Sequence, residues 1–121
     1  MVCYGVFNDG QLFGYYLVHF EGVQPNMLPR KAQLDTAALA KCAVISSFLI
    51  HPDFRGRSLQ KKLTEKAEIE AINRGFLHMV VNVRSDNKFS KGNFEDSGYI
   101  NLNPSKNSTR RRIETYIKSL I

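Results

Sequence analysis

The sequence predicts a mixed α/β domain built around one sheet that contains both parallel and antiparallel strands. Three observations lead to this prediction: an apolar hairpin near the N-terminus, a strand-helix-strand unit in the middle and an alternating pattern at the end. The chain has 121 residues, of which 43% are hydrophobic, so it can bury one modest core. We therefore expect a single domain over residues 1–121.

The N-terminal hairpin is the first predicted element. Val2 to Phe7 and Leu12 to Phe20 are rich in Val, Tyr, Phe and Leu, and Asn8-Asp9-Gly10 separates them. We expect Gly14 to mark a bulge or a close approach of another strand. The aromatic residues of the hairpin are interpreted as the alternating face of a half-buried sheet rather than as a platform for stacking bases.

A long connection, Glu21 to Lys41, follows the hairpin. Pro25 and Pro29 lie near its start, and Ala37 to Ala40 favours a helical turn near its end. Connections of this length in compact domains are often functional, so one hypothesis is a lid over a binding site. The other is a surface loop with one helical turn.

The central unit consists of a strand, a helix and a second strand. Ala43 to Ile50 is an apolar run that Pro52 ends, because proline has no N–H for a neighbouring strand. The next apolar positions follow a helical period and stop at Gly75, and His78 to Val83 is the second strand, parallel to the first. The predicted buried stripe is Leu59, Leu63, Ala67 and Ala71, widened by Ile69 and Ile72, with Lys61, Lys62, Glu65 and Glu68 placed away from it.

The turn between the first strand and the helix has the composition of an anion site. It contains Arg55, Gly56, Arg57 and Ser58, directly before the free N–H groups of the first helical turn. Asp86 and Asn87 end the second strand at the same edge of the sheet, where ligands of open α/β sheets bind. The alternative is that the arginines are solvated turn residues and Ser58 is an ordinary N-cap.

The C-terminal part is predicted to contain a helix and two strands. Asn87 to Ser97 favours a short helix, Tyr99 to Leu102 a strand, and Arg110 to Leu120 a terminal strand with a period of two. Asn103 to Ser108 is a polar turn that Pro104 keeps irregular.

Residues 43–99 resemble the GNAT superfamily of acetyl-CoA-dependent N-acetyltransferases, most closely its small bacterial members. The stretch HPDFRGRSLQKKL is similar to the family's phosphate-binding signature and its helix. A second family signature is matched by Asn87, Ser90, Phe94, Gly98 and Tyr99. The resemblance implies a GNAT-like fold whose two central strands splay apart to form an acyl-CoA cleft, and transfer of an acetyl group from acetyl-CoA to a small-molecule or peptide amine.

The resemblance also implies which residues bind the cofactor. Main-chain N–H groups of Arg55, Gly56, Arg57, Ser58, Leu59 and Gln60 would hold the pyrophosphate, Phe48 and Ile50 would bind the pantetheine arm through the main chain, and Asn87 and Ser90 would hold the arm near the thiol. Ser58 and Gln60 stand where the family usually has glycine or a small residue.

Several departures from the family concern catalysis. Phe94 stands where many members have a tyrosine that protonates the departing thiolate. The strand that often carries a basic carboxylate has only Ser46 and Ser47, so the catalytic residues are left unassigned. His51 is ionisable and near the predicted site, and we expect it to orient the turn. The usual N-terminal strand and helices of the family do not precede the hairpin, which indicates a fragment, a reduced domain or a domain completed by a second subunit, as in a homodimer.

Composition leaves two alternatives open. The chain carries 17 Lys and Arg against 11 Asp and Glu, a net charge of +6, which suits a phosphorylated cofactor but also a basic nucleic-acid-binding module. A CoA-binding domain without catalysis is the other alternative. No apolar run approaches the length of about 20 residues that spans a membrane. Cys3 and Cys42 lack metal-ligand spacing, and we expect them to be free, buried thiols in a reducing cytoplasm.

Overall fold

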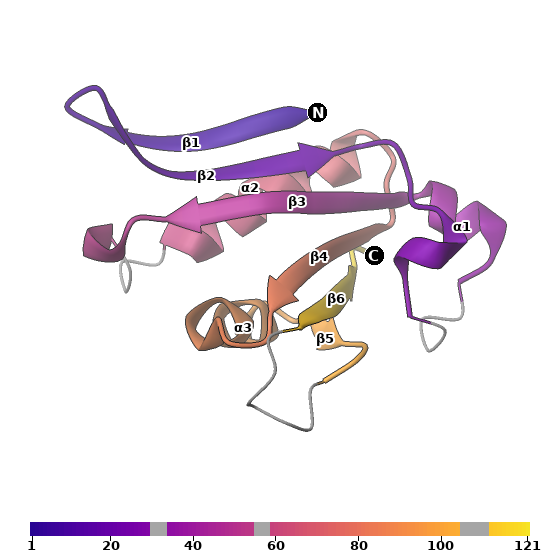
Figure 1. The fold of residues 1–121 in the computed structure, drawn as a ribbon. Helices are drawn as coiled ribbons and strands as arrows, with labels where there is room; N and C mark the ends of the chain where they lie inside the picture. The colour runs from indigo at the N-terminus through magenta and orange to yellow at the C-terminus, as the bar shows by residue number, and fades with distance from the viewer. Residues whose placement is uncertain (30–33, 55–58, 105–111) are drawn as a thin grey trace.

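The computed structural model describes residues 1–29, 34–54, 59–104 and 112–121, and these form one six-stranded mixed sheet with helices packed against it (Figure 1). The strands are β1 (Val2–Asn8), β2 (Gln11–His19), β3 (Cys42–Ile50), β4 (His78–Arg84), β5 (Ile100–Asn101) and β6 (Ile113–Ser119). The helices are α1 (Thr36–Ala40), α2 (Leu59–Asn73) and α3 (Lys88–Asp96), with short 3-10 turns at Pro25–Met27 and Pro52–Phe54. None of the helices in these described ranges is long and apolar enough to cross a lipid bilayer.

The strand order is β1-β2-β3-β4-β6-β5. β3 and β4 pair in parallel, and the other neighbours pair antiparallel. The helix between β3 and β4 is α2, so the central unit is the predicted strand-helix-strand unit. The mixed α/β fold class predicted from the sequence is confirmed.

The N-terminal hairpin is formed as the sequence predicts. Asp9 and Gly10 have φ angles of 51° and 79°, the left-handed conformations that a two-residue hairpin turn requires. Phe13 is skipped in the pairing, since Val6 pairs with Gly14 and Phe7 with Leu12, which places the bulge next to the glycine. A Cβ on Gly14 would lie only 3.1 Å from the carbonyl oxygen of Leu49, so β2 and β3 approach closely there.

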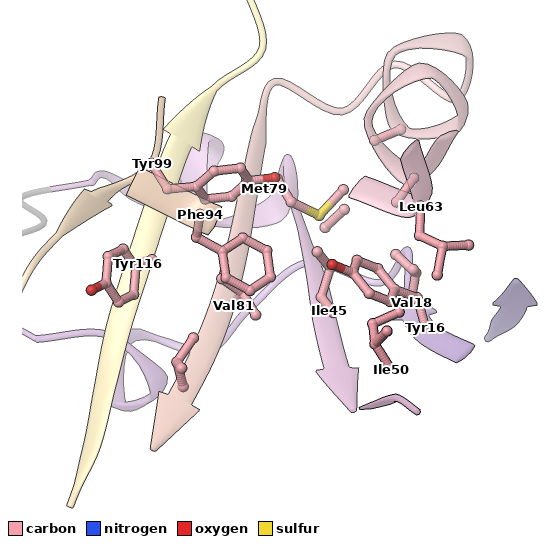
Figure 2. Packing of buried hydrophobic residues seen from close by; sticks show 14 residues of the cluster. Tyr16, Val18, Ile45, Ile50, Leu63, Met79, Val81, Phe94, Tyr99 and Tyr116 are labelled. Carbon is pink, nitrogen blue, oxygen red and sulfur yellow. The ribbon is translucent and has the colours of Figure 1, made fainter. Parts of the chain in front are cut away.

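The main hydrophobic core lies between the sheet and helices α2 and α3. Leu63, Ala67 and Ala71 of α2 and Phe94 of α3 are buried against side chains of β2, β3, β4 and β6. Figure 2 shows Tyr16 and Ile45 on the side of Leu63, and Tyr99 and Tyr116 near Phe94.

The buried stripe of α2 differs from the prediction, since Leu59 is half-buried and the polar residues Gln60 and Thr64 are buried. Ile69 and Ile72 are 59% and 51% exposed, whereas Glu68 is only 8% exposed. Glu68 is buried because its carboxylate accepts hydrogen bonds from the hydroxyl of Tyr99, at 2.8 Å, and from Nζ of Lys118, at 3.0 Å. The helix is therefore turned so that this paired carboxylate faces the C-terminal strands, and the two isoleucines face solvent.

A second, smaller core covers the opposite face of the sheet. Val44 and Val80 point to this face because side chains alternate along a strand. Val23, Leu28 and Leu39, all from the long connection between β2 and β3, pack against them. The connection forms the predicted helical turn as α1, and its described part is anchored by these buried side chains.

The C-terminal strands are shorter than predicted. β5 consists of Ile100–Asn101 alone, and β6 begins at Ile113, while residues 105–111 lie outside the described part of the chain. Glu114, Thr115 and Tyr116 of β6 are buried in succession, so both faces of this strand are covered. The alternation that predicted the strand therefore does not separate a buried face from an exposed one.

The two cysteines lie in different environments. Both are free, but Cys3 is exposed on β1, the edge strand, and only Cys42 is buried. The prediction that both thiols are buried is thus wrong for Cys3. Burial raises the pKa of the Cys42 thiol to about 11, and its sulfur lies 3.4 Å from the carbonyl oxygen of Ala38.

We expect the two thiols to differ in reactivity. At pH 8 a thiol with a pKa of about 11 is ionised in about one molecule in a thousand, and a buried thiol is also shielded from reagents. A disulfide reagent should therefore modify Cys3 in the folded protein and reach Cys42 only after unfolding in guanidinium. In a Cys3→Ser variant the fast phase should disappear, and a fast phase that persists would contradict the buried position of Cys42.

Candidate functional site

The central feature of the site is the point at which β3 and β4 separate. Their parallel pairing runs from Cys42 with His78 to Ile45 with Val81 and stops there. Ser46 is skipped in the pairing of β3 with β2, which makes it the extra residue of a β-bulge. A bulge bends the strand that contains it, and Figure 1 shows β3 and β4 diverging towards their C-terminal ends.

Beyond the bulge, one edge of β3 is free of strand pairing in the described part of the chain. β3 still pairs with β2 as far as Ile50, and the N–H of His51 donates to the carbonyl oxygen of Phe13 at 2.7 Å. Backbone groups of successive residues alternate between the two edges of an extended strand. The N–H and C=O groups of Phe48 and Ile50 therefore face the gap towards β4, where an extended ligand could pair with them.

Of the six predicted site residues that the structure describes, five surround one small pocket beside this gap. The pocket has a volume of about 40 Å³, and its lining residues are Phe48, Leu49, Ile50, Gln60, Asn87, Phe89 and Ser90. They come from β3, from the start of α2 and from the start of α3. Leu59 is half-buried and is not among the lining residues, and Arg55, Gly56, Arg57 and Ser58 lie outside the described residues.

Leu49 and Phe89 are lining residues that the sequence analysis missed. Leu49 is 53% exposed although it lies in an apolar strand, and Phe89 is 36% exposed in the first turn of α3. Exposed apolar side chains beside a pocket indicate ligand contact. Their exposure depends on the packing of the folded chain, so the sequence alone does not reveal it.

Asn87 and Ser90 are linked by the cap of α3. The side-chain oxygen of Asn87 accepts a hydrogen bond from the N–H of Ser90 at 3.1 Å, which is the usual N-cap interaction. The hydroxyl of Ser90 donates to Oε1 of Gln60 at 3.4 Å. The cap thus connects the start of α3 to the start of α2.

The first turn of α2 is fixed to the sheet by Tyr16. The Tyr16 hydroxyl donates to the carbonyl oxygen of Gln60, at 3.2 Å, and lies 2.8 Å from the hydroxyl of Thr64. Burial raises the pKa of Tyr16 well above its usual range, so the phenol stays protonated and able to donate. The N–H groups at the start of the helix have no partner within the helix, and the helix dipole adds partial positive charge there.

Helix α3 is held in place by buried polar side chains of β6. Glu114 is fully buried and accepts hydrogen bonds from Nζ of Lys91, at 3.0 Å, and from Nδ2 of Asn101, at 2.7 Å. The hydroxyl of Tyr116 donates to the carboxylate of Glu95. These bonds position the helix that carries Asn87 and Ser90 near its start.

His51 and Phe94 have structural surroundings. Nδ1 of His51 accepts a hydrogen bond from the N–H of Asp53 at 3.2 Å, so the ring stabilises the turn after β3. The Phe94 ring lies 5.4 Å from that of Phe48 and 5.2 Å from that of Tyr99, measured between centroids, and is 1% exposed. Phe94 therefore contributes to the packing of the core.

A larger pocket, of about 370 Å³, reaches the bulge from the opposite face of the sheet. Its lining residues are His19, Glu21, Gly22, Gln24, Met27, Val44 and Ser46. Val44 belongs to the second core, so this pocket lies on the face of the sheet opposite α2 and α3. The sequence analysis missed this pocket because its walls come from two segments that only the pairing of β2 with β3 brings together. Among the described residues no group of His, Cys, Asp and Glu could hold a metal ion.

Comparison with known proteins identifies the family. The model of the acetyltransferase (GNAT) family matches residues 1–99. The chain therefore belongs to the GNAT family of acetyltransferases. A search of curated protein sequences gave no match.

Solved structures share the fold. An N-acetyltransferase from Staphylococcus aureus Mu50 is 14% identical with a TM-score of 0.70, over 98% of this chain and 67% of the other. An acetyltransferase from Bacillus cereus is 14% identical with a TM-score of 0.69, over 98% of this chain and 71% of the other. The GNAT domain of S. lividans PAT is 19% identical with a TM-score of 0.69, over 95% of this chain and 58% of the other. At these identities the likeness establishes a common fold.

We expect removal of the Tyr16 hydroxyl to destabilise the protein by about 1 kcal/mol. Tyr16→Phe removes the bond to the first turn of α2, while Thr64 keeps its own bond to the carbonyl of Gln60 at 2.8 Å. Urea unfolding would measure the change in the free energy of unfolding. Tyr4→Phe is the matched control, because Tyr4 is only partly buried and packs at the edge of the core. Equal effects of the two substitutions would contradict the role of Tyr16.

Proposed function

We propose that residues 1–121 act as one acetyltransferase domain that binds acetyl-CoA and transfers its acetyl group to a primary amine. The observation that carries this proposal is the meeting of Phe48, Ile50, Gln60, Asn87 and Ser90 around one pocket, at the point where β3 and β4 separate. These residues come from distant parts of the sequence, and the family match gives the class of reaction.

The residues at the gap fit the arm of acetyl-CoA. The outward-facing main-chain groups of Phe48 and Ile50 can pair with an extended chain that carries amides, as an added strand would. Asn87 and Ser90 border the same pocket from α3. The start of α2 offers free N–H groups and the positive end of the helix dipole to the pyrophosphate. The net charge of +6 also attracts a polyanion.

Acetyl-CoA supplies the thioester whose carbonyl carbon the amine attacks. In our proposal main-chain N–H groups after the bulge stabilise the negative charge that develops on the carbonyl oxygen. The amine nitrogen forms the new bond to carbon, the carbon–sulfur bond breaks, and a proton from the amine balances the departing thiolate. Because Phe94 carries no hydroxyl, that proton does not come from the position used in many family members.

The larger pocket is the proposed entrance for the amine. It reaches Ser46, where the pairing of β3 and β4 has just ended, so an amine there would approach the thioester from the face opposite α2. His19 and Glu21 are its titratable lining residues. We propose that the Glu21 carboxylate attracts the cationic form of the amine and that His19 accepts the proton before attack.

A second candidate function is binding of CoA without transfer. Burial of Phe94 in the core favours it, because this position provides no proton donor. The two functions differ in one observable, the release of free CoA when acetyl-CoA is mixed with amines. Release above the rate of buffer alone supports transfer, and saturable binding without release supports the second candidate.

We expect acetyl-CoA to bind saturably in a calorimetric titration at moderate salt, and Gly56→Val to abolish this binding. The Val side chain would block the close approach of the main chain to the pyrophosphate. Gly92→Val is the matched control, since a Cβ on Gly92, in α3, meets no atom within 4 Å. Unchanged affinity in the Gly56 variant would overturn the assignment of this turn. Binding that is lost steeply with salt and does not depend on Gly56 would favour a nucleic-acid-binding module.

The entrance for the amine generates a kinetic prediction. Glu21→Gln should raise KM for a cationic amine with little change in kcat, because it removes attraction without touching the thioester. His19→Gln should lower kcat/KM by about a hundredfold, because it removes the proposed proton acceptor. Free thiol released from acetyl-CoA is the readout. Unchanged kinetics in both variants would place the amine elsewhere.

A further inference from the structure

Gln60 is a buried side chain with an unused hydrogen-bond donor. It is the second residue of α2, is 3% exposed and lines the small pocket beside the gap. Its Oε1 accepts the hydroxyl of Ser90 at 3.4 Å. Its Nε2 is buried and has no acceptor within hydrogen-bond distance among the described residues.

This arrangement is unfavourable for the protein without a ligand. A buried amide donor without an acceptor loses its bonds to water and gains none in return. The bond to Ser90 is long and compensates little. Buried polar groups in native structures are nearly always hydrogen-bonded, so an unsatisfied one at the wall of a pocket indicates a partner that is absent from the free protein.

The identity of this residue also departs from the family resemblance. Gln60 stands where the phosphate-binding signature usually has glycine or alanine, which bring no polar side chain to the pocket. Here the backbone of Gln60 serves the first turn of α2, through its bonds with Tyr16 and Thr64, and the side chain reaches the pocket beside Phe48. The two parts of the residue can thus act separately.

We propose that Nε2 of Gln60 donates a hydrogen bond to an amide carbonyl oxygen of the pantetheine arm, and so positions the arm between α2 and β3. The inference rests on the proposed function, since it assumes that acyl-CoA occupies the gap. Phe48 and Ile50 would bind the arm along its edge through the main chain, while Gln60 would bind it from the helix side. Because Nε2 can only donate a hydrogen bond, it selects a ligand that places an acceptor atom beside Gln60 in the pocket.

The experiment compares Gln60→Met with the wild-type protein. Methionine has a similar length and no donor, so coenzyme A should bind about tenfold more weakly in calorimetry, the effect of one hydrogen bond. Adenosine 3′-phosphate 5′-diphosphate, the part of coenzyme A without the arm, should bind equally to both proteins. The melting temperature of the free variant should be unchanged or higher, because the substitution removes an unsatisfied donor.

The outcomes separate this inference from the proposed function. If the wild type binds coenzyme A and Gln60→Met binds it equally well, the inference is overturned and the proposed function stands. If the variant binds both ligands more weakly and its melting temperature falls, Gln60 is a structural link between α2 and α3, and the inference is again overturned. If the wild type does not bind coenzyme A, both fail. Gln60→Glu is the second variant. It replaces the donor with an acceptor, so it should weaken the binding of coenzyme A at least as much as Gln60→Met does.

Discussion

The structure depends on a single irregularity, the bulge at Ser46 where β3 leaves β4. Before it, four residue pairs hold the two strands together in parallel, from Cys42 with His78 to Ile45 with Val81. After it, β3 remains in the sheet only through β2, and the edge of Phe48 and Ile50 is open to another chain. Both pockets border β3 near this point, the small one on the side of α2 and α3 and the large one on the opposite face. In the proposed function, the cofactor and the acceptor amine therefore enter from opposite faces of the sheet.

Hydrogen-bonded polar side chains in the interior fix the positions of α2 and α3 relative to the sheet. Tyr16 fixes the first turn of α2, Glu68 joins that helix to Tyr99 and Lys118, and Glu114 joins α3 to β6. Such bonds add modest net stability, but the cost of leaving any member unpaired makes alternative placements of the helices unfavourable. Gln60 is the exception in this group, since its Nε2 lacks such a partner among the described residues.

The sequence predicts the elements and their order well, because local rules decide them. The Asp9-Gly10 turn and the stop at Gly75 follow from the backbone conformations that these residues favour. The grouping of Phe48, Ile50, Gln60, Asn87 and Ser90 around one pocket also agrees with the sequence analysis, since the order of strands and helices brings them to one sheet edge, and their binding of a cofactor stays a prediction. Features that depend on the rotation of a helix or the pairing of distant strands are not predicted. Burial of Glu68 requires partners far along the chain, exposure of Cys3 follows from the edge position of β1, and the pocket with His19 exists only once β2 and β3 pair.

The bulge also determines which side chains of β3 point into the core. Side chains alternate along a strand, so the extra residue at position 46 decides which of the following side chains enter the core. With it, Ile50 lies in the main core together with Ile45, although an odd number of steps separates them. Regular pairing of the same residues, without the bulge, would send Ile50 towards the opposite face. Loss of one residue here would instead restore regular pairing and keep Ile50 on the core face, an even number of steps from Ile45, but it would remove the bend that separates β3 from β4. The extra residue is therefore needed for the gap between the strands and not for the core.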